Sequence, residues 1–442
     1  MRFHTSPRTT LAAAALVTGA LSVSACSAGS LGSSDDESGK TTISFLTNND
    51  PNNVKIAEAV IKAFEAENDD IDVKLDTRPG GGDGDNLVKT KLSTGEMAEV
   101  FEYNSGSLFQ AISPTTNLTP VTDEPWVGDL DETFASVVSA EEQVYGAPWG
   151  SITGGGIFYN IPVYEKLGLE VPETWDEFIA NNEKIKADGE VAPVEQTFGD
   201  TWTSQILVLA NNHNVTVADP NFAEDYTANK AKFSTTPAAL AGFEHLQELN
   251  ESGLLNEDYA SDLFTDGLTA VATGEAAHYP MITFGIPAIS GVAPDNVNDV
   301  GFFALPGDDA ASNGPTLWYP SGIYVPKGVE GDKLEAAKKF QAFVASPAGC
   351  DAQLSAAPVA GPWAVTTCEL PADVPTAVTD VQKYVEAGQS TPALEFLSPI
   401  KGPALEQILV EVGSGIRAAK DGAELYDKDV EKQAQQLGLP GW

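Results

Sequence analysis

Hydrophobic and polar residues alternate along two early segments of the chain, 41–47 and 71–75. Alternation with a period of two is typical of a half-buried strand. Between the two segments, after a turn at 48–51, apolar residues from Val54 to Phe64 recur every three or four positions, which predicts an amphipathic helix. The order strand, helix, strand is a βα repeat. Its continuation along the chain predicts an α/β sheet with helices on both faces.

The same periodicities predict the later elements. The predicted strands lie at 98–101, 144–149, 156–160, 300–305 and 322–325, and the predicted helices at 87–92, 174–187, 237–252, 333–345, 375–387 and 403–420, with a last helix ending before Gly438. The glycine-rich run 80–85 predicts a mobile loop at a strand end. Thr174 is expected to cap its helix, and Trp175 to pack that helix on the sheet. With 442 residues and no internal repeat or long linker after residue 41, the chain favours two or three lobes.

The first residues have the pattern of an export signal. Arg2 and Arg8 precede an apolar stretch at 11–23 that is too short to cross a bilayer. The sequence ending at Cys26 resembles the bacterial lipobox, in which the cysteine receives a lipid before cleavage. We therefore predict a lipoprotein signal peptide at 1–25, lipidation of Cys26, and a flexible tether at 26–40. An ordinary signal peptide with an incidental cysteine is the alternative.

Charge and cysteine content narrow the function. The chain has 24 Lys and Arg against 64 Asp and Glu, a net charge of −40 that opposes nucleic-acid binding. Removal of the leader takes away two arginines and no acids, so the mature chain is still more acidic. In an oxidising compartment Cys350 and Cys368 are predicted to form a disulfide worth about 3 kcal/mol, the alternative being two reduced buried thiols.

Known catalytic and metal motifs are absent from the sequence. There is no His-Glu-x-x-His, no Gly-x-Ser-x-Gly and no Cys or His cluster with zinc spacing. His213, His245 and His278 lie in different segments and are expected to be satisfied surface or core residues. We therefore predict no cofactor, no metal and no enzymatic activity. A catalytic carboxylate pair, as in glycoside hydrolases, is left open by the large number of acids.

Five segments together resemble the maltose-binding-protein-like family of bacterial extracellular solute-binding proteins. The densest part of the resemblance is Tyr-Gly-Ala-Pro-Trp at 145–149, the Tyr-Asn strand and helix at 155–169, and Pro-Glu-Thr-Trp-Asp-Glu-Phe at 172–178. Weaker agreement comes from Gly-Glu-Ala-Ala at 274–277 and Ser-Gly-Ile-Tyr-Val-Pro-Lys at 321–327. The resemblance extends thinly over the rest of residues 41–440.

This resemblance implies a two-lobed, periplasmic-binding-protein-like α/β fold (type II) with a ligand cleft between the lobes. The first lobe is expected at 41–150 and 280–320, and the second at 151–279 and 321–442. The expected hinges are 150–156, 278–284 and 317–322. The resemblance also implies a monomeric lipoprotein, tethered through Cys26 to the outer face of the bacterial cytoplasmic membrane, that delivers its solute to the permease of an ABC importer.

Carbohydrate is the leading solute because aromatic faces pack against sugar C–H groups while amides and carboxylates bind the hydroxyls. The predicted ligand-binding residues lie at strand ends and lobe crossings: Asn48, Asp50, Glu102, Tyr103, Asn104, Trp149, Asp200, Trp202, Phe284, Trp318, Tyr319 and Trp363. A cationic or peptide-like solute in the same fold is the first alternative. A surface-anchored glycan hydrolase is the second.

Overall fold

The computed structural model of the chain describes residues 39–442. The predicted signal peptide, Cys26 and nearly all of the predicted tether lie outside these residues. Residues 40–442 form one unit that contains two main sheets. Among the described residues, no helix is both long and apolar enough to cross a membrane.

The first sheet has the strand order β2-β1-β3-β12-β6. Strand β1 pairs in parallel with β2 and β3, whereas β12 runs antiparallel to both β3 and β6. The strands are β1 (Thr41–Asn48), β2 (Ile71–Arg78), β3 (Val100–Tyr103), β6 (Ala147–Trp149) and β12 (Ser321–Tyr324). Alternating residues of β1 put Ile43 and Phe45 into the core, as the sequence predicted.

Short and long helices accompany this sheet. They are α1 (Pro51–Glu67), α2 (Gly81–Thr94), α3 (Ser107–Ala111), α4 (Pro114–Asn117), α5 (Glu132–Val137), α14 (Gly331–Val344) and α15 (Pro347–Ala356), with the 3-10 turn η1 (Pro125–Asp129) and the small hairpin β4 (Ser139–Ala140) and β5 (Gln143–Val144). Helix α14 packs on β1, and α15 packs on α1. The predicted loop at 80–85 is wrong, because α2 already begins at Gly81.

The second sheet has the order β13-β11-β7-β9-β8, and β10 also pairs with β7. The long strand β7 pairs with β9 on one side and with β10 and β11 on the other. The strands are β7 (Thr153–Asn160), β8 (Ala192–Val194), β9 (Ala276–Ile282), β10 (Val300–Ala304), β11 (Thr316–Trp318) and β13 (Thr391–Pro392). The predicted α/β class with more than one lobe is therefore confirmed.

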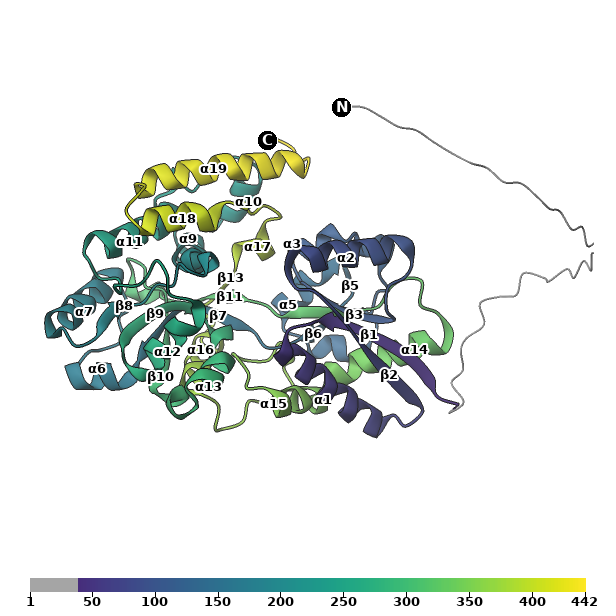
Figure 1. Cartoon of the computed structure of the whole chain (residues 1–442). Helices are drawn as coiled ribbons and strands as arrows, with labels where there is room; N and C mark the ends of the chain where they lie inside the picture. The colour runs from purple at the N-terminus through teal and green to yellow at the C-terminus, as the bar shows by residue number, and fades with distance from the viewer. Residues whose placement is uncertain (1–38) are drawn as a thin grey trace, which may run out of the picture. The chain divides into compact units, whose positions relative to one another are not determined.

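Most helices of the chain belong to this second part, where α18 and α19 lie side by side at the end of the chain (Figure 1). The helices are α6 (Ile161–Leu167), α7 (Trp175–Asp188), α8 (Ile206–Ala210), α9 (Asn212–Ala218), α10 (Phe222–Thr227), α11 (Pro237–Glu251), α12 (Phe264–Thr273), α13 (Ile286–Val292), α16 (Thr376–Glu386), α17 (Leu394–Leu397), α18 (Leu405–Gly413) and α19 (Ala419–Gln436). The 3-10 turns are η2 (Thr201–Gln205), η3 (Thr283–Gly285), η4 (Pro294–Asp299) and η5 (Ala310–Ser312).

Two helix predictions are informative. Thr174 caps α7 in a capping box with Glu177, as predicted. Trp175 is buried, but its ring stacks at 3.7 Å on His245 of α11 rather than on a strand, so the prediction that it packs α7 on the sheet is corrected. The single helix predicted at 403–420 is instead two, α18 and α19. The break falls after Gly413, and Gly415 has a positive φ of 71°, a conformation that ends helices and favours glycine.

The chain passes between the two sheets at three places in the described residues, namely 150–152, 319–320 and 357–375. We call 41–149 with 321–356 the first lobe, and 153–318 with 376–442 the second lobe. The predicted assignment of 280–320 to the first lobe is corrected, because β10 and β11 pair within the second sheet. Residues 321–356 likewise move to the first lobe, because β12 pairs with β3 and β6. The hinge expected at 278–284 is instead the buried strand β9 and the start of η3.

The crossings are tied to one another. The backbone N–H of Ile152 donates to the carbonyl of Pro362 at 2.8 Å, and Ser151 forms a bridge with Trp363. In the same region Cys350 and Cys368 form the predicted disulfide. The disulfide connects α15 of the first lobe to the third crossing, so this crossing is anchored before it enters the second lobe.

Candidate functional site

A pocket with about 450 Å³ of empty space lies where three distant parts of the chain meet. These are the loop and helix after β3, the crossing between β11 and β12, and helix α17. The pocket is lined by Asn104, Ser105, Ser107, Leu108, Trp318, Tyr319, Ser321, Glu395 and Phe396. We call it the interlobe pocket, because its residues come from both lobes and from the crossing between them.

The first-lobe wall of the interlobe pocket is held by backbone and hydroxyl contacts. Strand β3 ends at Tyr103, so Asn104 and Ser105 emerge at the carboxyl end of a central strand, where ligands commonly bind in open α/β sheets. The Ser105 hydroxyl donates to the carbonyl of Pro320 at 2.9 Å, and the Tyr324 hydroxyl donates to the carbonyl of Asn104 at 3.2 Å. These bonds fix the loop against the crossing.

The aromatic walls come from the crossing and from α17. Tyr319 and Phe396 meet edge to face with their ring centroids 5.8 Å apart. Trp318 packs over Gly155, where an added Cβ would come within 2.5 Å of the indole. On the first lobe, Gly106 has a φ of 68°, and a Cβ there would lie 2.6 Å from the Phe396 ring. The Phe396 ring therefore packs directly against Gly106 of the opposite lobe.

The polar groups of the interlobe pocket are mostly neutral. Burial, with a smaller contribution from the negative charge of Asp131, raises the pKa of Tyr319 to about 12, so its hydroxyl keeps its proton at neutral pH. Glu395 is the only charged residue in the lining. Its partly buried side chain forms no hydrogen bond and no ion pair with any described residue. The pocket thus combines three rings, several hydroxyl and amide groups, and one free carboxylate.

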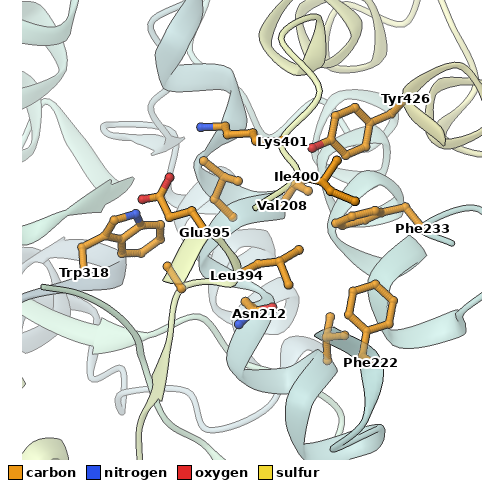
Figure 2. A pocket seen from close by; sticks show the side chains of 13 residues that line it. Val208, Asn212, Phe222, Phe233, Trp318, Leu394, Glu395, Ile400, Lys401 and Tyr426 are labelled. Atoms are coloured by element: carbon orange, nitrogen blue, oxygen red, sulfur yellow. The ribbon is translucent and has the colours of Figure 1, made fainter. Parts of the chain in front are cut away.

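A second pocket shares a wall with the first. Trp318 and Glu395 also line an apolar space of about 500 Å³ inside the second lobe, which we call the apolar pocket (Figure 2). Its other lining residues are Val208, Leu209, Asn212, Val215, Phe222, Phe233, Ala393, Leu394, Ile400, Lys401 and Tyr426. Helix α17 therefore contributes to both pockets, and the segment after it contributes to the apolar pocket alone.

An aromatic cluster lies at the end of β9 in the second lobe. The Trp202 ring contacts Phe264 and Phe284 at centroid distances of 5.3 and 5.7 Å, and Phe284 is 41% exposed. Asp200 accepts a hydrogen bond from the backbone N–H of Phe264 at 2.8 Å and so fixes α12 beside the cluster. The residue before Phe284, Thr283, accepts from the N–H of Gly154 at 2.9 Å. The cluster therefore adjoins the first residues of the second lobe after the crossing.

The structure brings only part of the predicted site together. Asn104, Trp318 and Tyr319 line the interlobe pocket. Trp202 and Phe284, with Asp200 beside them, form the aromatic cluster instead.

Three predicted polar residues are occupied in local structure. The buried carboxylate of Glu102 accepts hydrogen bonds from the Thr47 hydroxyl at 2.8 Å and from the backbone N–H of Asn48 at 3.0 Å. The Asn48 side chain also donates to Glu102. Asp50 caps α1 by accepting from the N–H groups of Asn52 and Asn53. These side chains hold the end of β1 to the start of α1, which is the turn-forming alternative for Asn48 and Asp50.

Three predicted aromatic residues lie in the core. Tyr103 is fully buried, and its ring lies 5.9 Å from the guanidinium of Arg78. Trp149 is 5% exposed, packs edge on against Phe45, and donates from its indole N–H to Asn53 at 2.7 Å. Trp363 is buried at the crossing. Tyr103 and Trp149 were predicted at strand ends and Trp363 inside the disulfide loop, but all three side chains are buried in the protein.

Sequence reasoning missed six lining residues: Ser105, Ser107, Leu108, Ser321, Glu395 and Phe396. A signal existed for the first three, because a polar, glycine-containing run follows directly after a predicted strand. Glu395 and Phe396 gave no such signal. They follow a two-residue strand that no periodicity reveals, and they lie nearly 290 residues from the loop they face.

The described residues contain no group of three or more His, Cys, Asp or Glu side chains arranged to hold a metal ion. Two of the histidines are instead fully satisfied. His278 contacts the Tyr164 hydroxyl at 2.6 Å and the carbonyl of Pro193 at 2.9 Å, and burial lowers its pKa to about 3. His213 contacts Thr391 and the carbonyl of Ser312. Both act as structural hydrogen-bonding groups, as the sequence indicated.

Comparisons with known proteins give a consistent result. The family described as "Bacterial extracellular solute-binding protein" matches residues 50–349. The multiple sugar-binding protein of Streptococcus mutans is 28% identical over 266 residues, which is 58% of this chain and 60% of that protein. The melibiose/raffinose/stachyose-binding protein of Bacillus subtilis is 24% identical over 334 residues, 72% of each chain.

Solved structures share the fold. A chitin oligosaccharide binding protein superimposes with a TM-score of 0.72 at 21% identity, covering 90% of this chain and 99% of that one. The raffinose complex of the solute-binding protein RafE gives a TM-score of 0.72 at 19% identity, covering 90% of this chain and all of that one. At such identities the likeness concerns the fold alone.

Proposed function

Because the chain belongs to the bacterial extracellular solute-binding protein family, we propose that it is the substrate-binding component of an ABC importer and that it binds a carbohydrate in the interlobe pocket. The main support for this proposal is that three aromatic rings lie together with hydroxyl and amide groups from both lobes. Pyranose rings present apolar C–H faces to aromatic rings and a rim of hydroxyls to polar groups. This combination of surfaces suits such a ligand.

The names of the relatives support this substrate class. The two curated relatives described above are named for sugars, and the two solved structures described above are named for an oligosaccharide and for raffinose. The aligned part covers only 60% of the Streptococcus mutans protein, so transfer of its function to this chain is part of the proposal.

Binding across the two lobes explains how capture would be signalled. Asn104 and Ser107 come from the first lobe, whereas Glu395 and Phe396 come from the second. A ligand that touches both sides stabilises the arrangement in which they are close, and so shifts the population toward it. Movement of the lobes would occur at the crossings 150–152 and 319–320. The solute would then be released, chemically unchanged, to the permease.

Glycan hydrolysis has little support in this pocket. Hydrolases of the common type place two carboxyl groups across the scissile bond. Glu395 is the only carboxylate among the residues lining the interlobe pocket. We therefore retain the binding function. We propose in addition that Cys26, which lies outside the described residues, carries the lipid that holds the protein at the outer face of the cytoplasmic membrane.

The proposal is tested by calorimetry and thermal unfolding of the chain from Cys26 onward with a panel of mono- and oligosaccharides. A sugar present at 100 times its Kd is expected to stabilise the protein by about 2.7 kcal/mol. Chromatography after prolonged incubation is expected to recover the sugar intact. A panel in which no sugar binds, while a basic peptide or a polyamine does, would refute the carbohydrate assignment.

Substitutions locate the site. Trp318→Ala removes the ring shared by the two pockets and is expected to weaken sugar binding at least tenfold, whereas Trp318→Phe keeps a ring face and most of the affinity. Trp442→Ala is the matched control, because Trp442 lines neither pocket and its indole donates to the carbonyl of Thr227. Equal affinity in Trp318→Ala and the control would place the site elsewhere.

A further inference from the structure

The carboxylate of Glu395 is placed as a ligand-binding group rather than a structural one. It is partly buried on α17 and lines both the interlobe and the apolar pocket. Figure 2 shows its carboxylate on the side of the Trp318 indole, away from Phe222 and Phe233. A buried carboxylate obtains hydrogen-bond partners from the protein, whereas a partly buried one without such partners is open to water or to a ligand. Among the described residues Glu395 has none.

No cation of the protein neutralises this charge within the interlobe pocket. The lining contains no Lys, Arg or His. Lys401 lines the apolar pocket together with Glu395, but it is exposed and forms no ion pair with Glu395. An exposed ammonium that keeps its hydration interacts weakly with a carboxylate beyond contact distance. The negative charge of Glu395 therefore faces the space that the ligand would occupy.

Other features of the pocket also favour a positive ligand group. The negative charge of Asp131 acts on Tyr319 and adds negative potential to the same wall. Trp318, Tyr319 and Phe396 offer ring faces, which attract cations through their quadrupole. Finally, the net charge of −40 attracts cationic solutes to the protein from a distance and leaves neutral ones unaffected.

We infer, on the basis of the proposed function, that the interlobe pocket binds an amino sugar, a carbohydrate with a protonated amine, more tightly than its neutral counterparts. The Glu395 carboxylate would recognise the positive charge of the amine. An ammonium donates charge-assisted hydrogen bonds to a carboxylate, and these are stronger than the bonds donated by neutral hydroxyls. The rest of the sugar would stack on the rings as any pyranose does. A neutral or N-acetylated sugar would lack the ion pair and leave Glu395 only hydroxyl or amide partners.

The test is a calorimetric comparison of three matched ligands on the chain from Cys26 onward, at pH 6 and low salt. The probes are the β-1,4-linked disaccharides of glucosamine, N-acetylglucosamine and glucose. The amino disaccharide is expected to bind at least tenfold more tightly than both neutral ones, and this preference is expected to fall as salt is raised. Glu395→Gln keeps the size of the side chain but removes its charge, and it is expected to abolish the preference by weakening the binding of the amino disaccharide at least tenfold.

Glu386→Gln is the matched control, because it removes one charge from the exposed face of α16, where Glu386 accepts only from Gln382. It is expected to leave the preference intact. Equal or tighter binding of a neutral disaccharide by the wild type would overturn the inference and leave the carbohydrate function standing. Loss of the preference in Glu386→Gln, or its survival in Glu395→Gln, would also overturn the inference. Binding of none of the sugars would instead refute the proposed function.

Discussion

Glu195 offers a test of how burial couples protonation to stability in the second lobe. The residue directly follows β8 and is only 4% exposed. Its Oε1 accepts from the Asn256 amide at 3.0 Å, and the same amide donates to Asp262 at 2.9 Å. Burial, followed by the negative charge of Asp262 and then of Asp266 and Glu275, raises the pKa of Glu195 from 4.5 to about 8. At neutral pH the folded protein therefore holds a proton on this carboxyl group.

The sign of the pH dependence follows from this difference in pKa. Below pH 4.5 Glu195 is protonated in both the folded and the unfolded chain, so it does not affect stability. Between pH 4.5 and 8 the unfolded chain releases the proton while the folded chain retains it, so the folded state loses stability as the pH rises. A carboxyl whose pKa rises from 4.5 to about 8 corresponds to a loss on the order of 4 kcal/mol by pH 8.

Glu195→Gln mimics the protonated side chain and should remove this loss. We expect the variant and the wild type to unfold at similar urea concentrations near pH 4.5, and the variant to become more stable by up to about 4 kcal/mol at pH 8. His278 and His245, whose pKa values burial lowers to about 3, reduce stability as the pH falls from 6.5. Because both proteins contain them, their contribution cancels in the difference.

The measurement is urea unfolding followed by tryptophan fluorescence at half-unit pH steps from 4.5 to 8. Glu386→Gln serves again as the exposed control and should track the wild type at every pH. If Glu195→Gln and the wild type lose stability in parallel across this range, the Glu195 carboxyl is ionised or hydrated in the folded protein. The reasoning from burial would then be refuted.

Two further substitutions test the packing of the site. Gly106→Val places a branched side chain at a φ of 68° and against the Phe396 ring, so it should lower the free energy of unfolding by about 2 kcal/mol or more and reduce the affinity for sugar. The double variant with Phe396→Ala relieves the clash but not the backbone strain. Unchanged affinity in Gly106→Val alone would show that the Phe396 contact is unimportant for binding. Trp149→Ala should lower the free energy of unfolding by about 3–5 kcal/mol in denaturant titrations, because the buried indole and its hydrogen bond to Asn53 are lost. The sugar affinity of the remaining folded protein should be unchanged. A loss of sugar affinity without a loss of stability would instead assign Trp149 to the binding site.

The sequence predicted elements well where one periodicity dominates. Alternation located β1 and β2 to within a few residues, and the capping residue Thr174 located the start of α7. The prediction from the sequence failed where the structure departs from the local helix propensity of the residues. The glycines at 81–84 are weak helix formers, yet α2 begins there, and Gly84 packs so closely on Pro79 and Arg78 that a Cβ would not fit. Tertiary packing rather than propensity sets that helix start.

Side-chain direction at the strand ends was the harder problem. Strand β3 lies between β1 and β12, so all four of its residues are buried and alternation no longer separates an inner from an outer face. Tyr103 therefore turned out to be core, while its neighbour Asn104 lines the interlobe pocket. Trp149 ends the edge strand β6 and also packs inward, on Phe45.

Two of the pocket residues that escaped prediction lie where the family pattern no longer matches the chain. The framework of both lobes is built by periodic segments, which the family pattern covers through residue 349. Glu395 and Phe396 lie beyond that match, on a four-residue helix between a two-residue strand and α18. A short connection of this kind can change without disturbing either sheet. The residue that we propose recognises the charge of the ligand, Glu395, is therefore carried by a short connection outside the part of the chain that the family pattern matches.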